Sequence, residues 1–292
     1  MLPQDILAQV RRLEIVTSRL VAESFSGDYL SVFKGRGMEF ASVREYAEGD
    51  DPRDIDRNVS ARAGKPFVRQ YVEERELTVV IAVDLSASQS FGSADRLKRE
   101  AATEIAAALA FAALKNNDKV GLAIFTDSLE RFVPPRKGRR HVLAIIREVL
   151  AYEPKGRRTA LGPALEKIAR MLKRRCILVV ASDFRDTGFE RPLKLCALKH
   201  DLIPVVIEDP REASMPETTA VVAVRDPETG EDGILDLKSE ARAYAADEVR
   251  RRAELAKVFR SSGIEPVRVG TDKPSLDPLL AFFRRRASRR SR

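Results

Sequence analysis

The sequence lacks the features that would direct a protein into or across a membrane. No apolar run in its 292 residues approaches the roughly 20 residues needed to span a bilayer. The amino terminus carries Asp5, Arg11, Arg12 and Glu14, so it lacks the apolar centre of a signal peptide and indicates an amphipathic helix instead. We therefore expect no membrane span and a cytoplasmic protein.

Cysteine and histidine are scarce, and tryptophan is absent. The two cysteines, Cys176 and Cys196, lie among apolar neighbours, which favours core thiols over a disulfide framework. Neither His141 nor His200 stands near a candidate nucleophile, and we expect both at the surface or its boundary. The sequence therefore offers few residues that could form a Ser-His-Asp or Cys-His catalytic site.

Positive charge is concentrated at the carboxyl terminus. The net charge is +8, and six of the positive charges are arginines within residues 284–292, which leaves the remainder of the chain near neutrality. Neither interleaved aromatic residues nor a recognised nucleic-acid-binding fold accompanies this Arg-rich tail. We expect it to be a frayed, solvated end, and we expect no nucleic-acid partner.

From Leu77 onward, apolar strands alternate with amphipathic helices. Strands are predicted at 77–84, 119–126 and 176–183, and a long Ala-rich helix is predicted at 94–115. This alternation predicts an α/β fold with a doubly wound, mostly parallel sheet flanked by helices. In such sheets, ligands bind outside the carboxyl ends of the strands.

Two segments interrupt the alternation and suggest a division of the chain. Residues 26–76 are polar and dense in charge, so we expect a small, partly β subdomain between an N-terminal helix over 1–25 and the α/β domain over 77–292. Within that domain, residues 209–238 are predicted to be an insertion. Its turn-rich stretch DPETGEDG joins VVAV to ILDL as a β-hairpin.

Oxygen ligands follow the first predicted strand in the pattern D-x-S-x-S, formed by Asp84, Ser86 and Ser88. In an extended loop these alternate side chains point the same way, and Asp183 likewise ends an apolar strand. Carboxylates and hydroxyls suit Mg²⁺ or Mn²⁺ and do not suit zinc. We predict a cation site that accepts one more carboxylate from a protein partner, although the serines could instead cap a helix.

An enzymatic interpretation of Asp84 is the alternative. Phosphatases with an aspartyl nucleophile also place an Asp at a strand end before a short loop. Their second acid lies two residues later, where this chain has Ser86, and a hydroxyl protonates a leaving group poorly near neutral pH. No lysine stands at an obvious phosphate-clamping position. A metal-dependent phosphoryl-transfer or hydrolytic enzyme therefore remains as the alternative to a non-enzymatic binding module.

The D-x-S-x-S stretch resembles the metal-ion-dependent adhesion site of von Willebrand factor A domains. In that family a Thr from a later loop and an Asp ending a central strand complete the ligand set, which implies roles for Thr159 and Asp183. Thr159 also stands where the N-cap of the following helix belongs. Both interpretations of Thr159 are open at this point.

Nearly the whole chain resembles a bacterial family catalogued as domain of unknown function 58. The matching stretches include GRGMEF, VREYAEGDDPRDID, SARAGKPFV, EERELTVVIAVDLSAS, NNDKVGLAIFTD and DPETGE. One departure is Arg57, where the family usually has Trp. The resemblance implies a von Willebrand factor A-like fold. It also implies a MoxR-type AAA+ ATPase as partner, with this chain as its adaptor in maturing or remodelling another complex.

Overall fold

The computed structural model describes residues 8–14, 39–72, 76–94, 96–216 and 218–290. Residues 8–14 are helical. The rest of the helix expected over 1–25 lies outside the described residues, as does the first part of the segment 26–76.

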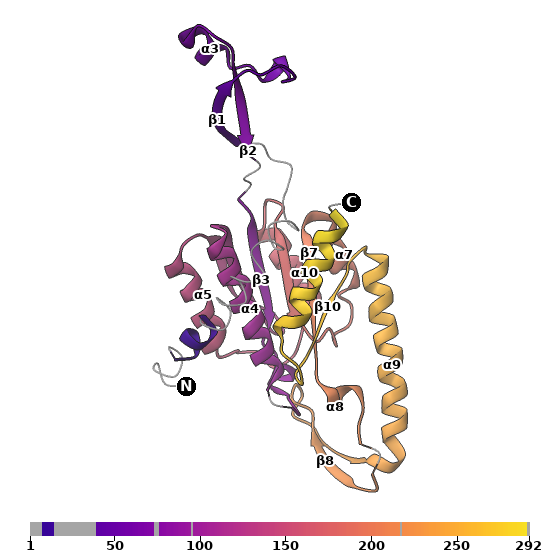
Figure 1. The fold of residues 1–292 in the computed structure, drawn as a ribbon. Helices are drawn as coiled ribbons and strands as arrows, with labels where there is room; N and C mark the ends of the chain where they lie inside the picture. Colours follow the sequence, from indigo (N-terminus) through magenta and orange to yellow (C-terminus); the bar gives the residue numbers. More distant parts are fainter. Residues whose placement is uncertain (1–7, 15–38, 73–75, 95, 217, 291–292) are drawn as a thin grey trace.

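A small antiparallel hairpin precedes the large sheet. It comprises β1 (Glu39–Glu45) and β2 (Phe67–Val72), with the short helices η2 (Pro52–Asp54) and α3 (Arg57–Ala63) between them. The Asp56 carboxylate caps α3 by accepting hydrogen bonds from the Asn58 and Val59 amides. Arg57 is exposed at the first residue of α3. Figure 1 shows this hairpin apart from the large sheet, beyond the amino end of β3.

Six strands form the large sheet in the order β10-β7-β6-β3-β4-β5. All neighbours are parallel except β5, which turns back antiparallel to β4. The strands are β3 (Thr78–Asp84), β4 (Lys119–Phe125), β5 (Leu129–Arg136), β6 (Ile177–Ser182), β7 (Asp201–Glu208) and β10 (Val267–Gly270). The predicted α/β fold with a doubly wound, mostly parallel sheet is therefore confirmed.

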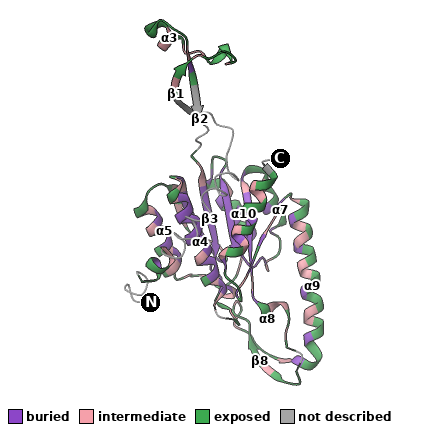
Figure 2. Ribbon diagram, viewed as in Figure 1, coloured by how far each residue is buried: buried purple, intermediate pink, exposed green. Residues whose placement is uncertain are grey.

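Helices cover both faces of this sheet, which explains why its central strands are apolar on both sides (Figure 2). One face packs against α4 (Lys98–Lys115), α5 (Arg139–Ala151) and α10 (Leu276–Arg290). The other face packs against α6 (Leu161–Met171), α7 (Glu190–Lys199) and α9 (Leu237–Ser261).

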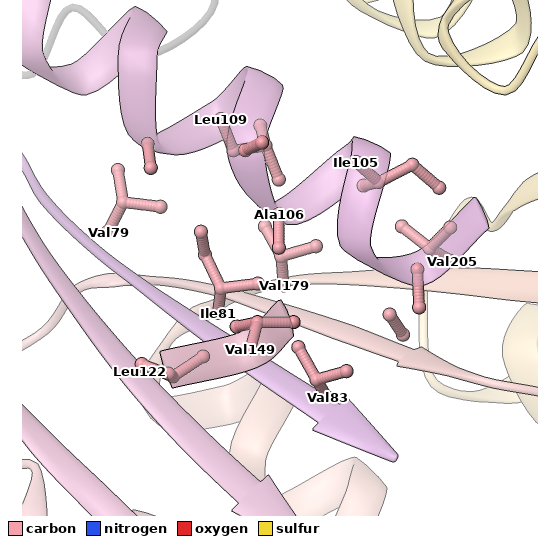
Figure 3. Packing of buried hydrophobic residues seen from close by; sticks show 14 of the residues in the cluster. Val79, Ile81, Val83, Ile105, Ala106, Leu109, Leu122, Val149, Val179 and Val205 are labelled. Atoms are coloured by element: carbon pink, nitrogen blue, oxygen red, sulfur yellow. The ribbon is translucent and has the colours of Figure 1, made fainter. Parts of the chain in front are cut away.

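The Ala-rich helix α4 lies directly on β3. Figure 3 shows Ile105, Ala106 and Leu109 of α4 packed near Val79 and Ile81 of the sheet. The helix begins at Lys98 rather than at residue 94, because the Glu100 side chain accepts a hydrogen bond from the Leu97 amide and starts the helix there. The first residue of α4 thereby comes to the carboxyl end of the sheet.

The Arg-rich tail is helical, so the expectation of a frayed end at 284–292 is wrong for the residues described there. Helix α10 continues to Arg290 instead of ending at Phe283. Arg286 donates two hydrogen bonds to Asp201, and Arg289 pairs with Glu265. These acids belong to segments far away in the sequence, which is why the tail alone did not indicate helix.

An insertion extends past the carboxyl ends of the strands (Figure 1). It contains α8 (Pro210–Ala213) and the antiparallel hairpin of β8 (Val221–Arg225) and β9 (Asp232–Asp236), and it runs directly into α9.

In the part of the chain that the structure describes, no helix combines the length and the apolar character needed to cross a membrane.

Candidate cation-binding site

Two buried carboxylates lie at the carboxyl ends of neighbouring strands. Asp84 is the last residue of β3 and is 0% exposed, and Asp183 directly follows β6 and is 2% exposed. Because β3 and β6 pair in parallel, their carboxyl ends adjoin. One oxygen of Asp84 accepts a hydrogen bond of 2.9 Å from the Ser86 amide, and the other accepts one of 2.6 Å from the Ser182 hydroxyl.

These hydrogen bonds come from neutral groups only. Among the described residues, no ammonium or guanidinium group is paired with Asp84. Burial, and next the nearby negative charge of Asp183, raise the pKa of Asp84 to about 7. The local field at Asp84 therefore favours the arrival of positive charge.

The two motif serines form a tight turn instead of the extended loop that was expected. Residues Ala87–Ser90 form the 3₁₀ helix η3, and Ser86 precedes it without making a side-chain cap. The hydroxyls of Ser86 and Ser88 nevertheless lie 3.0 Å apart, because the 3₁₀ turn folds Ser88 back toward Ser86. The structure therefore places two hydroxyl oxygens together beside the Asp84 carboxylate, and the helix-capping interpretation of Ser86 is wrong.

The capping interpretation of Thr159 is also wrong. The residue that precedes α6 is Ala160, and the α6 amide of Leu161 donates to Asp186 instead. The Thr159 hydroxyl donates a hydrogen bond of 2.8 Å to the Glu228 carboxylate. Thr159 thus contacts an acidic side chain instead of any of the other four predicted ligands.

Backbone hydrogen bonds nevertheless bring the Thr159 loop to the motif. The Ala87 amide donates to the Arg157 carbonyl at 2.8 Å, and the Ala160 amide donates to the Thr126 carbonyl at 2.8 Å. The loop that carries Thr159 therefore lies against both the η3 turn and the end of β4.

A buried lysine stands beside Asp183, although no lysine was expected near the site. Lys98 is 0% exposed, and its ammonium donates hydrogen bonds of 2.7 Å to Asp183 and 2.6 Å to Glu212 of α8. Burial alone would lower the pKa of Lys98, but the two carboxylates outweigh it and the pKa is raised. Lys98 is therefore charged, and it compensates Asp183 rather than Asp84.

Comparison with known proteins identifies the family. Residues 42–254 match the family described as "Protein of unknown function DUF58". The chain belongs to the DUF58 family. An uncharacterized protein of Mycobacterium bovis is 32% identical over 289 residues, covering 98% of this chain and 90% of the relative.

Solved structures resemble the DUF58 chain only loosely. BatB of Bacteroides thetaiotaomicron is 18% identical with a TM-score of 0.46, covering 74% of this chain and 98% of BatB. The SpRpn10 VWA domain is 13% identical with a TM-score of 0.38, covering 71% of this chain and 94% of that domain. With TM-scores below 0.5, these likenesses support no conclusion about function.

The donors at this edge of the DUF58 chain fit a hard divalent cation. They are carboxylate and hydroxyl oxygens, with no sulfur or imidazole among them. No three His, Cys, Asp or Glu side chains within the described ranges are grouped for a metal, so a cation here depends on hydroxyl donors. The side chain of Gln89 in the η3 turn is 1% exposed, and its amide atoms have no hydrogen-bond partner among the described residues. A bound water or ion is one of the features that account for such an unsatisfied buried amide.

A Cys-His site is ruled out by burial. His200 is 1% exposed, so the expectation of a surface position is wrong. Its Nδ1 lies 3.4 Å from the Cys176 sulfur. Burial lowers the pKa of His200 to about 4 and raises that of Cys176 to about 12, so neither the thiolate nor the imidazolium forms near neutral pH.

Sequence reasoning missed four residues at this site. Ser182 could have been found, because it precedes Asp183 within the same strand end. Gln89 directly follows Ser88 of the D-x-S-x-S pattern. The sequence did not indicate a role at this site for Lys98 or Glu228, because charged residues on a helix and in a turn normally face solvent.

Proposed function

We propose that this DUF58 chain is a non-enzymatic, divalent-metal-dependent protein-binding module. Asp84, Ser86 and Ser88 would hold Mg²⁺ or Mn²⁺, and Thr159 and Asp183 would act directly or through water. A bound cation of this kind offers a coordination place to an acidic side chain of a protein partner. The observation that carries the proposal is the Asp84 carboxylate, which is buried next to Asp183 and hydrogen-bonded only by neutral groups.

The chain's own residues would orient these donors before the partner arrives. The Ser86 amide and the Ser182 hydroxyl hold the two oxygens of Asp84. Lys98 holds Asp183 in place from the first turn of α4. Such fixed donors lose little freedom on binding, which favours affinity.

The partner we propose is a MoxR-type AAA+ ATPase, with this chain as its adaptor in maturing or remodelling another complex. Two points support this choice. The DUF58 resemblance implies it, and the sequence has no G-x-x-x-x-G-K-[ST] loop with which to bind nucleotide itself. ATP hydrolysis would then be supplied by the partner.

The contacts at the site weigh against the hydrolytic alternative. The position of the general acid in such an enzyme is taken by Ser86, whose hydroxyl protonates a leaving group poorly near neutral pH. The Lys98 ammonium is paired with two carboxylates and is therefore not free to bind a phosphate. Incubation of the pure protein with generic phosphomonoesters and Mg²⁺ tests this directly, and turnover lost in Asp84→Asn would restore the enzymatic interpretation.

The decisive experiment is a Mn²⁺ titration followed by electron paramagnetic resonance. Wild-type protein is expected to bind one Mn²⁺, which Mg²⁺ displaces, and Asp84→Asn should lose this binding. Asp127→Asn is the matched control, because Asp127 is an exposed acid just beyond the neighbouring strand β4. Equal Mn²⁺ binding by wild type and Asp84→Asn would overturn the metal site.

A binding assay then tests the partner. The purified chain is mixed with a MoxR-type ATPase from the same source, in Mg²⁺ and again in EDTA. We expect a complex only in Mg²⁺ and only with an intact Asp84. A complex that forms equally in EDTA would mean that the partner docks away from this site.

A further inference from the structure

An acidic side chain in the hairpin of the insertion contacts Thr159, one of the predicted cation ligands. Glu228 lies in the turn between β8 and β9, and its carboxylate accepts hydrogen bonds from the Thr159 hydroxyl at 2.8 Å and the Thr159 amide at 3.3 Å. Within the described residues, no Lys or Arg side chain is paired with this carboxylate. Glu228 therefore brings a carboxylate to one of the predicted cation ligands.

The turn itself sets the position of Glu228. Asp226 accepts hydrogen bonds from the amides of Glu228 at 2.7 Å and Thr229 at 3.1 Å, which is an Asx turn. Gly230 closes the turn with φ of 77°, a conformation that favours glycine. Arg157 also donates a hydrogen bond of 3.1 Å to the Pro227 carbonyl, which ties the turn to the loop of Thr159. The stretch DPETG thus builds a defined turn that presents Glu228 to the site.

The strands behind this turn are weakly attached to the rest of the protein. The side chains of Val221 and Ile234 are 65% and 78% exposed, so the hairpin buries little apolar surface. The two segments that flank the hairpin are anchored more firmly, through Glu212 to Lys98 and through Glu248 of α9 to Arg185. A hairpin with firm ends and few buried contacts can open locally at a small cost in free energy.

We propose that Glu228 is an internal ligand of the cation site, which occupies in the free protein the coordination place that an acidic partner residue takes in the complex. This inference rests on the proposed function. It adds that the partner must displace the hairpin turn, so that the chain limits its own affinity until the turn opens. Competition of this kind weakens binding of the partner. Its apparent Kd equals the intrinsic Kd divided by the fraction of molecules in which the coordination place is free.

The test uses Mn²⁺ as the probe and Glu228→Gln as the variant. The amide is of the same size and can still accept from Thr159, so we expect the variant to fold. Loss of the charged ligand should weaken Mn²⁺ binding roughly tenfold, the order seen when a single group around a metal is removed. A water should replace the carboxylate, so the relaxation of solvent protons by bound Mn²⁺ should increase. Glu231→Gln, at an exposed acid of the same turn, is the matched control and should change neither quantity.

A second measurement covers the hairpin directly. Hydrogen exchange of residues 221–236 should slow when Mn²⁺ is added to wild type, and it should not slow in Glu228→Gln. If wild-type protein binds Mn²⁺ and Glu228→Gln matches it in affinity, proton relaxation and hydrogen exchange, Glu228 is not an internal ligand. The proposed function would remain unaffected by that result. Wild-type protein that binds no Mn²⁺ would overturn the proposed function itself.

Discussion

The ammonium of Lys98 and the carboxylate of Asp183 lie 2.7 Å apart in the interior, although 85 residues separate them in the sequence. Lys98→Met should lower the free energy of unfolding by about 3–5 kcal/mol, because it leaves the buried Asp183 carboxylate without its cation. Urea unfolding followed by circular dichroism measures this loss.

A double mutant distinguishes the contribution of the ion pair to stability from that of the packing of the lysine side chain. Adding Asp183→Asn to Lys98→Met removes the carboxylate charge that the lysine had compensated, so part of the lost stability should return. Glu212 keeps Arg185 as a second partner, at 3.6 Å, and needs no further change. If the double mutant is less stable than Lys98→Met alone, the loss comes from packing of the lysine stem rather than from charge.

Asp84→Asn should make the metal-free protein more stable. The substitution removes a buried charge that only neutral donors compensate, so the free energy of unfolding in EDTA should rise by about 1–3 kcal/mol. Wild type should in turn gain about 2.7 kcal/mol from Mg²⁺ at one hundred times its Kd, and Asp84→Asn should gain none. Thermal unfolding with and without Mg²⁺ measures both effects, and a variant destabilised in EDTA would contradict the assigned role of the charge.

His200 should make stability depend on pH. Burial lowers its pKa from 6.5 to about 4, so between these values the unfolded chain binds a proton that the folded chain does not. The stability contributed by the neutral imidazole is thus complete above pH 6.5 and is lost as the pH falls toward 4, by about 3 kcal/mol in all. Urea unfolding at a series of pH values should show this slope reduced in His200→Leu and retained in His141→Gln.

Arg286 should stabilise the carboxyl-terminal helix. Its guanidinium and the Asp201 carboxylate are 22% and 20% exposed, so Arg286→Ala should cost about 1 kcal/mol, near the upper end for an accessible pair. Arg289 is 69% exposed, and Arg289→Ala should cost less. Mn²⁺ binding should be unchanged in both variants, since Asp201 begins β7 and Glu265 precedes β10, at the end of the sheet opposite to Asp84; weaker binding would link the tail to the cation site.

Helix boundaries were harder to predict than the presence of helices. The apolar pattern correctly indicated a helix after β3, but its start at Lys98 depends on local contacts of Leu97 and Glu100. The end of α10 was missed because its arginines pair with acids from β7 and the segment before β10. A local pattern reports which face of a helix is buried, whereas its ends depend on particular partners.

The sequence by itself determined the layered α/β architecture, because a strand buried on both faces must be apolar along its whole length. It also indicated that Asp84 and Asp183 each stand at the end of an apolar strand, whereas the structure showed that these two strands are neighbours. Only the tertiary structure decided which charges those carboxylates meet. Lys98 reaches Asp183, and Glu228 reaches Thr159 across 69 residues. Polar pairings of this kind have no periodicity in the sequence, since they depend on where folding places two distant side chains.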